Sequence, residues 1–198
     1  MAEHEIKNLF KEKQALLEGH FELTSGRHSD MYVQCSLVLQ HPDVAEKLGE
    51  ELVARVREEN AGVPVRLSVV CAPALGGIIL AHVVARALGV RAIFAERDSK
   101  DGMLKLRRGF EIKPGETILA VEDVITTGGS LKEIVQMVHA QGAKLAGVAA
   151  VAERSAVPIN FGTLKTVLLK LPLKDYSPQD CPLCKEGSPA VKPGSRIK

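Results

Sequence analysis

Hydrophobic residues along this chain follow two patterns, a helical spacing and short continuous runs. Residues 5–17 and 42–60 carry apolar side chains every three or four positions, as amphipathic helices do, and Pro42 suits a first helical turn. Two further helical patterns cover residues 78–88 and 131–140. Apolar runs that predict buried strands lie at 67–71, 91–95, 118–121, 145–151 and 166–171. Because these strands alternate with helices, the pattern predicts an α/β domain.

The composition is that of one soluble globular domain. The chain has 198 residues, 45% of them hydrophobic and 25% charged, and a formal net charge of +2. This small charge does not indicate a partner among nucleic acids or anionic membranes. The apolar run at 78–84 is too short to span a bilayer, and the polar, acidic residues 1–5 are unlike a secretory signal. We therefore expect a cytoplasmic protein whose four cysteines are reduced.

The most informative stretch joins the strand predicted at 118–121 to the helix predicted at 131–140. Two acidic residues, Glu122 and Asp123, come directly after the apolar run. Small or hydroxylated residues then lead into the helix, namely Thr126, Thr127, Gly128, Gly129 and Ser130. In open α/β sheets, ligands bind where strands end and helices begin. The backbone amides, the hydroxyls and the helix N-terminus of such a turn suit a phosphate group.

The acidic pair indicates a second ligand group, because carboxylates placed beside a phosphate would repel it. The vicinal hydroxyls of a ribose donate hydrogen bonds, and a divalent cation nearby can balance the charge. The acidic pair and the phosphate turn together predict a site for a ribose 5-phosphate. Neither a Walker loop nor a G-x-G-x-x-G fingerprint occurs in the chain. The competing interpretation is a solvated acidic turn before an ordinary helix N-cap.

Two segments resemble a known family. Residues 121–130, VEDVITTGGS, resemble the phosphoribosyl diphosphate (PRPP) motif of the type I phosphoribosyltransferases. Residues 21–35, FELTSGRHSDMYVQC, are similar to the N-terminal segment that covers the base in the orotate phosphoribosyltransferases. The resemblance implies the type I fold, in which helices flank a mainly parallel central sheet. It also implies a single domain with a small hood (residues 1–40) over the sheet edge and a C-terminal tail (175–198).

The resemblance further implies an activity and a set of functional residues. The phosphoribosyl group of PRPP would pass to N1 of orotate, giving orotidine 5′-phosphate and diphosphate in pyrimidine (UMP) biosynthesis. Asp123 is the candidate acidic partner of the reacting ring, and Mg²⁺ would be carried mainly by PRPP rather than by the protein. The residues expected to bind PRPP are Arg97, Lys100, Glu122, Asp123, Val124, Ile125, Thr126, Thr127, Gly128, Gly129 and Ser130.

Three residues are candidates for contact with orotate. Arg154 follows the strand predicted at 145–151, where a cation suits a carboxylate-bearing substrate, and the family has an orotate-binding arginine at this place. As a lone residue, Arg154 would be interpreted as part of a surface ion pair. Thr126 and Tyr32 complete the set, since Tyr32 falls where an aromatic residue lies against orotate in the family. By composition alone, the segment around Tyr32 would be a surface hairpin with His20 and His28 exposed.

The charged segment 96–110 predicts a mobile arm or a hairpin. In orotate phosphoribosyltransferases the corresponding loop closes over the site of the neighbouring subunit in a homodimer. This makes Arg97 and Lys100 candidates for the leaving diphosphate, and Lys100 also a candidate catalytic residue. The segment departs from the family pattern, because Asp98 stands where a second lysine is common and no histidine is present. A solvated charged hairpin is the alternative interpretation.

Two positions elsewhere also differ from the family pattern. Thr24 and Gly76 stand where many or some members have a lysine. Gly76 belongs to the turn 72–77, which in type I phosphoribosyltransferases binds the diphosphate through its backbone. A tight strand–helix turn is the alternative for these residues. Two other functions are alternatives. One is a phosphoribosyltransferase for another base, against which the segment 21–35 argues. The other is a PRPP-sensing regulator without turnover, which the missing lysines and histidine of the loop keep open.

The tail contains one C-x-x-C pair, Cys181 and Cys184, which is half of a four-cysteine zinc pattern. A structural metal shared across a dimer is one interpretation of this pair. Reduced, unliganded thiols in a loose tail are the interpretation that we favour from the sequence. We accordingly expect no metal-binding residues in the protein itself.

Overall fold

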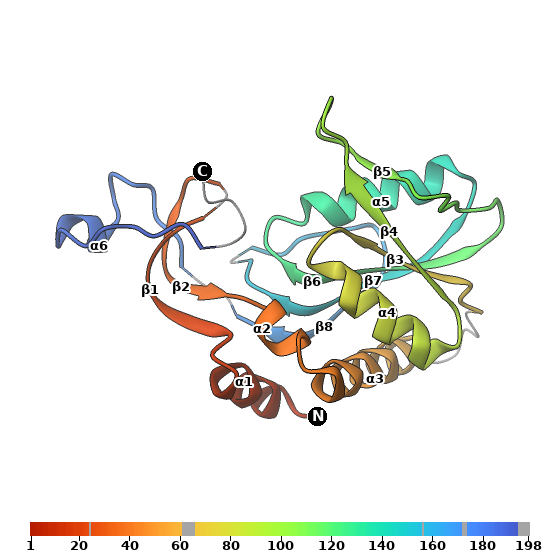
Figure 1. Cartoon of the computed structure of the whole chain (residues 1–198), viewed down its shortest axis with the longest axis horizontal. Helices are drawn as coiled ribbons and strands as arrows, with labels where there is room; N and C mark the ends of the chain where they lie inside the picture. Colours follow the sequence, from red (N-terminus) through yellow and green to blue (C-terminus); the bar gives the residue numbers. More distant parts are fainter. Residues whose placement is uncertain (24, 61–65, 156, 172–173, 194–198) are drawn as a thin grey trace.

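A computed structural model describes residues 1–23, 25–60, 66–155, 157–171 and 174–193 of the chain (Figure 1). Its centre is a six-stranded sheet with the order β5-β4-β3-β6-β7-β8. The strands are β3 (Val69–Pro73), β4 (Arg91–Arg97), β5 (Leu104–Leu106), β6 (Thr117–Ile125), β7 (Lys144–Glu153) and β8 (Lys165–Lys170). Neighbouring strands pair in parallel, except that β5 pairs antiparallel to β4. The mainly parallel sheet predicted from the sequence is confirmed.

Helices cover both faces of this sheet (Figure 1). One face carries α1 (Glu3–Glu12), α3 (Pro42–Glu59) and α4 (Gly77–Leu88), and the other carries α5 (Gly129–Ala140). Successive side chains of a strand point to opposite faces. Val70 of β3 accordingly packs among the side chains of α3 and α4, whereas its neighbour Val69 packs with those of α5. The continuous apolar runs in the sequence are therefore strands buried on both faces.

The first helix is shorter than the sequence pattern predicts. α1 ends well before residue 17, and Gln14 takes a left-handed conformation with a φ of 53° where the chain turns. Leu16 and Leu17, which their spacing assigned to the helix, instead begin strand β1 (Leu16–Glu22). Both residues pair across to strand β2 (His28–Val33). The helical prediction for these leucines is wrong because pairing with β2 overrides their local spacing.

Strands β1 and β2 form an antiparallel pair outside the central sheet, here called the hood hairpin (Figure 1). Helix α2 (Ser36–Leu39) follows it and leads into α3. The thiol of Cys35, at the end of the hairpin, lies 3.5 Å from the backbone carbonyl oxygen of Asp123 in β6. The end of the hood hairpin therefore lies beside the acidic pair.

The C-terminal segment 174–193 lies along the hood hairpin. Backbone bridges join Tyr176 to His28 and Val191 to Phe21, and the short helix α6 (Pro182–Lys185) lies between them. The expectation of a loose tail is therefore wrong for these residues. The expectation that His20 and His28 are exposed is also wrong, because both rings are buried next to this segment, with 6% and 9% of their surface accessible.

Some sequence predictions fall outside the described residues. Thr24, where the family pattern has a lysine, is one of these positions, and residues 194–198 of the predicted tail are others. Among the helices of the described residues, none combines the length and the apolar character needed to cross a membrane.

Candidate active site

The predicted site residues collect at one edge of the central sheet. Strands β3, β6 and β7 lie side by side and run parallel, so their carboxyl ends meet at the same edge. β6 is longer than its apolar run and continues through the acidic pair to Ile125. The backbone amide of Arg154 donates a hydrogen bond to the Ile125 carbonyl at 2.9 Å. This bond places Arg154 beside the start of the turn at 126–130.

The acidic pair is half-buried, and no ammonium or guanidinium group of the described residues forms an ion pair with it. Burial raises the pKa of Glu122 to about 8; the charge of Asp123 adds to this shift, while a hydrogen bond with Ser130 and the charge of Arg97 oppose it. Burial also raises the pKa of Asp123, against hydrogen bonds from backbone amides. Carboxyl groups perturbed in this way cluster at functional sites. Their oxygens suit ribose hydroxyls and a hard divalent cation.

The turn after the acidic pair is open to solvent, because Thr126 and Thr127 are both exposed. Gly128 enters α5 with a φ of 74°, and a Cβ at this position would lie 2.9 Å from the ring of Phe161. Only glycine therefore fits here, and glycine has no side chain that could cap the helix. The N-terminus of α5 beside two threonine hydroxyls is an arrangement that binds phosphate.

A second glycine turn approaches the acidic pair from β3. It spans residues 74–77, enters α4, and contains a cis peptide bond between Ala74 and Leu75. A Cβ on Gly76 would lie 2.7 Å from each carboxylate oxygen of Asp123. A longer side chain at this position would therefore displace the Asp123 carboxylate. Gly76, which departs from the family pattern, therefore allows the Asp123 carboxylate to lie close to the backbone of this turn.

Arg154 is buried at the sheet edge, with 9% of its surface accessible. Its guanidinium carbon lies 5.8 Å from the ring centroid of Tyr32 in the hood hairpin. In the described part of the chain, no carboxylate forms an ion pair with it. Burial lowers the pKa of Arg154 and raises the pKa of Tyr32. A buried guanidinium without an anionic partner is costly, which suits a site that receives a carboxylate from a ligand.

Residues 96–110 include the end of β4 and all of β5, which pair antiparallel and form a hairpin that projects from the sheet (Figure 1). Four of its five basic residues pair with carboxylates of the same chain. The pairs are Arg97 with Glu133, Lys105 and Arg107 with Asp98, and Arg108 with Glu96. Lys100 is exposed, and the described residues offer it no carboxylate within ion-pair distance. Lys100 is therefore the cation of this hairpin that is free to meet a ligand.

The departure from the family pattern at Asp98 has a structural explanation. A hydrogen bond from the backbone amide of Lys100 lowers the pKa of Asp98 to about 2, and the side chains of Arg107 and Lys105 contribute further. Asp98 thus organises the hairpin through its negative charge, where a lysine would repel the same partners. At the base of the hairpin, Arg97 donates a hydrogen bond to the hydroxyl of Ser130 at 3.3 Å.

The structure thus brings the acidic pair, the turn 126–130, Arg154, Tyr32 and Arg97 to one edge of the sheet. Lys100 lies apart from them, on the projecting hairpin. The part that each residue plays in binding or catalysis stays a prediction. Sequence reasoning missed the cluster of His20 and His28 with the tail cysteines, because its members are far apart along the chain.

This parallel sheet, with an acidic pair and a phosphate turn at the end of its central strand, is a type I phosphoribosyltransferase fold. A family model described as "Phosphoribosyl transferase domain" matches residues 38–178. The solved structure of orotate phosphoribosyltransferase from Aeropyrum pernix superposes with a TM-score of 0.68 at 21% sequence identity, covering 84% of this chain and 94% of that chain. At this identity the superposition supports the fold alone.

Relatives of similar sequence show which group of phosphoribosyltransferases this chain resembles in sequence. The orotate phosphoribosyltransferase of Heliobacterium modesticaldum is 49% identical over 99% of this chain and 100% of its own length. That of Pelotomaculum thermopropionicum is 51% identical over 99% of both chains. The chain therefore belongs to the orotate phosphoribosyltransferase family.

Proposed function

We propose that this protein transfers the 5-phosphoribosyl group of PRPP to N1 of orotate and releases diphosphate. The observation that carries the choice of base is Arg154, which is buried and has no carboxylate partner among the described residues. Orotate has a carboxylate that fits this guanidinium, and Tyr32 offers a ring for the planar base to lie against. Uracil and the purine bases lack that carboxylate.

The phosphoribosyl part of PRPP fits the rest of the edge. The exposed turn 126–130 and the N-terminus of α5 receive the 5-phosphate, while Glu122 and Asp123 accept hydrogen bonds from the ribose hydroxyls. The acidic pair, which has no ion-pair partner among the described residues, also suits the Mg²⁺ that accompanies PRPP. When bound, this ion would balance the charge of the diphosphate, with PRPP oxygens and water as most of its ligands.

In the chemical step, a bond forms between N1 of orotate and the anomeric carbon, and the bond from that carbon to the diphosphate oxygen breaks with its electron pair. N1 loses its proton, for which Asp123 is the acceptor that we assign. Because the pKa of Asp123 is raised, its carboxylate is a stronger base than an ordinary aspartate and takes up a proton more readily. Positive charge on the ribose and negative charge on the diphosphate develop together, so the protein acts mainly by positioning and charge stabilisation.

Two cations of the hairpin complete the proposed site. Arg97 meets the phosphate turn of its own chain through Ser130. Lys100 lies in the turn of the projecting hairpin, and we assign it to the leaving diphosphate in the neighbouring subunit of a homodimer. The proposed setting is cytoplasmic pyrimidine biosynthesis, with no nucleic-acid or membrane partner.

The direct test mixes the purified protein with orotate, PRPP and Mg²⁺ and follows the loss of orotate absorbance. We expect a loss that requires all three components and yields orotidine 5′-phosphate by mass spectrometry. Parallel reactions with uracil and with adenine in place of orotate should show no product. Turnover of another base in preference to orotate would overturn the proposal, and PRPP binding without turnover of any base would indicate a sensor.

A further inference from the structure

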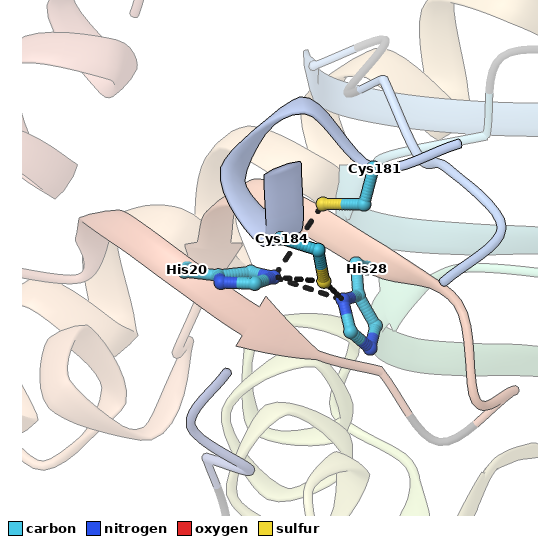
Figure 2. A group of neighbouring side chains, drawn as sticks. All are labelled: His20, His28, Cys181 and Cys184. Atoms are coloured by element: carbon cyan, nitrogen blue, oxygen red, sulfur yellow. Dashed lines mark hydrogen bonds between the residues drawn. The ribbon is translucent and has the colours of Figure 1, made fainter. Parts of the chain in front are cut away.

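Four side chains from the two ends of the chain meet where the C-terminal segment packs on the hood hairpin (Figure 2). His20 and His28 come from the two strands of the hood hairpin, while Cys181 directly precedes α6 and Cys184 lies within it. One nitrogen or sulfur atom from each of the four lies within 4.8 Å of the others. Cys181 and both histidines are buried, and all four point toward a common centre. This cluster is separate from the acidic pair and Arg154.

Hydrogen bonds alone do not satisfy this arrangement. Nδ1 of His20 lies 2.8 Å from the carbonyl oxygen of Ser188, so Nδ1 carries the proton and Nε2 presents a single lone pair. Three possible donors face that lone pair, namely Nδ1 of His28 at 2.8 Å and the thiols of Cys181 and Cys184 at 3.5 and 3.7 Å. One lone pair cannot serve three donors well. A cation at the centre resolves the conflict, because all four atoms can then donate lone pairs to it.

The spacing of the four atoms is close to that of a tetrahedral zinc site. Zinc bonds of about 2.0–2.3 Å to nitrogen and sulfur place neighbouring ligand atoms roughly 3.3–3.8 Å apart. Three of the four separations between a cysteine sulfur and a histidine nitrogen are 3.2, 3.5 and 3.7 Å, and every pair among the four atoms lies within 4.8 Å. The two histidine nitrogens are closer, at 2.8 Å, and would separate by about half an ångström around the ion. The bond from Nδ1 of His20 to a backbone carbonyl is the outer contact that orients metal-binding histidines.

Besides two backbone bridges and two surface ion pairs to the hood hairpin, the tail has little that could hold it folded. Within residues 174–193, Cys181 is the single residue whose side chain is buried, and it belongs to neither hydrophobic cluster of the domain. Short segments without an apolar core are commonly held by disulfides or metals. A disulfide between Cys181 and Cys184 would close a loop of only four residues. It would not involve the two histidines and would not link the tail to the hood hairpin. A metal ion bound by all four side chains would join the tail to the hood hairpin.

From these observations we propose that His20, His28, Cys181 and Cys184 form a structural zinc site within a single chain. The ion fastens the C-terminal segment to the hood hairpin, and so holds the strand that carries Tyr32. The thiols lose their protons on binding and the histidines bind as neutral rings, as zinc requires. The sequence-based interpretation of free thiols is replaced by four ligands from two segments about 150 residues apart.

Metal analysis of the full-length protein tests the proposal directly. We expect one zinc ion per chain after gel filtration, and loss of zinc with a fall in melting temperature on incubation with a strong chelator. Replacement of the ion by Co²⁺ should give the intense visible bands of tetrahedral cobalt with thiolate ligands. Protein that is purified without metal and does not change in melting temperature when zinc is added would overturn the proposal. A Cys181–Cys184 disulfide found by mass spectrometry in the protein as purified, before any chelator is added, would also overturn it.

Variants with matched controls assign the ligands. Cys184→Ser and His28→Gln should each abolish the cobalt bands and lower the zinc content several-fold. The controls are Cys71→Ala, which changes a buried cysteine of β3, and His139→Gln, which changes an exposed histidine of α5. Both controls should keep one zinc per chain. If Cys184→Ser fails to fold, the cobalt spectrum of the unaltered protein still decides the proposal. Zinc retained in full by both ligand variants would refute it.

The effect on substrate binding rests on the proposed function. In His28→Gln, a hood hairpin that is no longer fastened should raise the KM for orotate several-fold and leave the KM for PRPP nearly unchanged. Zinc content and melting temperature are read without any substrate, so failure of the zinc site and failure of the proposed activity give distinguishable results.

Discussion

The sheet edge and the cluster of His20, His28, Cys181 and Cys184 both bring together polar groups whose interactions within the chain are incomplete. The two sites differ in what is missing. At the edge, the carboxyl groups of the acidic pair and the guanidinium of Arg154 have no ion-pair partners in the described residues, and the adjoining turn is open to solvent. In the cluster, the groups are closely packed and face one another, with Cys181 fully buried. An open site with unmatched charge suits a ligand that comes and goes. A compact site with three of its four side chains buried suits a resident ion.

This difference predicts opposite consequences of mutation. Removing a charge from the edge should reduce activity and leave stability unchanged or improved, because the folded protein bears the cost of burying that charge. Removing a ligand from the cluster should reduce stability first, because zinc binding is part of the folding free energy. The following predictions test the edge side of this comparison, from the largest expected effect to the smallest.

The largest effect is expected at Asp123. Asp123→Asn keeps the shape of the side chain but cannot accept a proton, so kcat should fall by about 100-fold or more. The melting temperature should stay the same or rise, because burial disfavours the charged Asp123 in the folded state. Steady-state kinetics and a thermal melt measure the two quantities. The matched control is Asp43→Asn, an exposed position in the first turn of α3. An unchanged kcat in Asp123→Asn would remove Asp123 from the mechanism.

Arg154 should show the next largest effect, on substrate selectivity. Arg154→Ala removes a charge-assisted contact and should raise the KM for orotate by roughly 30-fold. The KM for PRPP should change far less, because Arg154 faces Tyr32 rather than the phosphate turn. Arg91→Ala is the control, since Arg91 pairs with Glu116 at the surface. Equal increases in the two KM values would argue against contact between Arg154 and orotate.

The two lysines of the hairpin offer a matched pair. Lys100 has no ion-pair partner in the described residues, whereas Lys105 is held by Asp98 and Asp101. Lys100→Ala should lower kcat by about tenfold, as expected for loss of one charge from a leaving-group site. Lys105→Ala should leave kcat within about twofold and mainly loosen the hairpin. Equal kcat values for the two variants would contradict the proposed role of Lys100.

The smallest effect concerns the pH dependence of stability. The pKa of Glu122 rises from 4.5 to about 8 on folding. Between these two values the folded state holds a proton that the unfolded state has lost, so the stability contributed by this group falls as the pH rises. Between pH 5 and 8, the melting temperature of the ligand-free protein should therefore decline relative to Glu122→Gln by a few degrees. Parallel curves for the two proteins would contradict the raised pKa.

Local sequence was sufficient for the central layers and for most of the edge. The runs at 118–121 and 145–151 became β6 and β7, the helical pattern at 42–60 became α3, and the turn 126–130 joins β6 to α5. These predictions succeeded because period and turn chemistry act over a few residues. The prediction for Leu16 and Leu17 failed because their pairing partner lies in another strand.

The sequence by itself determined the fold class and the predicted phosphoribosyl site, since the acidic pair, the threonines and the glycines of residues 122–130 are contiguous. Only the tertiary structure decided which groups meet that site or each other from afar. It placed Tyr32 against Arg154, put Gly76 against Asp123, and buried His20 and His28 beside Cys181 and Cys184. The physical reason is that burial and ligand geometry depend on distances between segments, and no local pattern encodes such a distance.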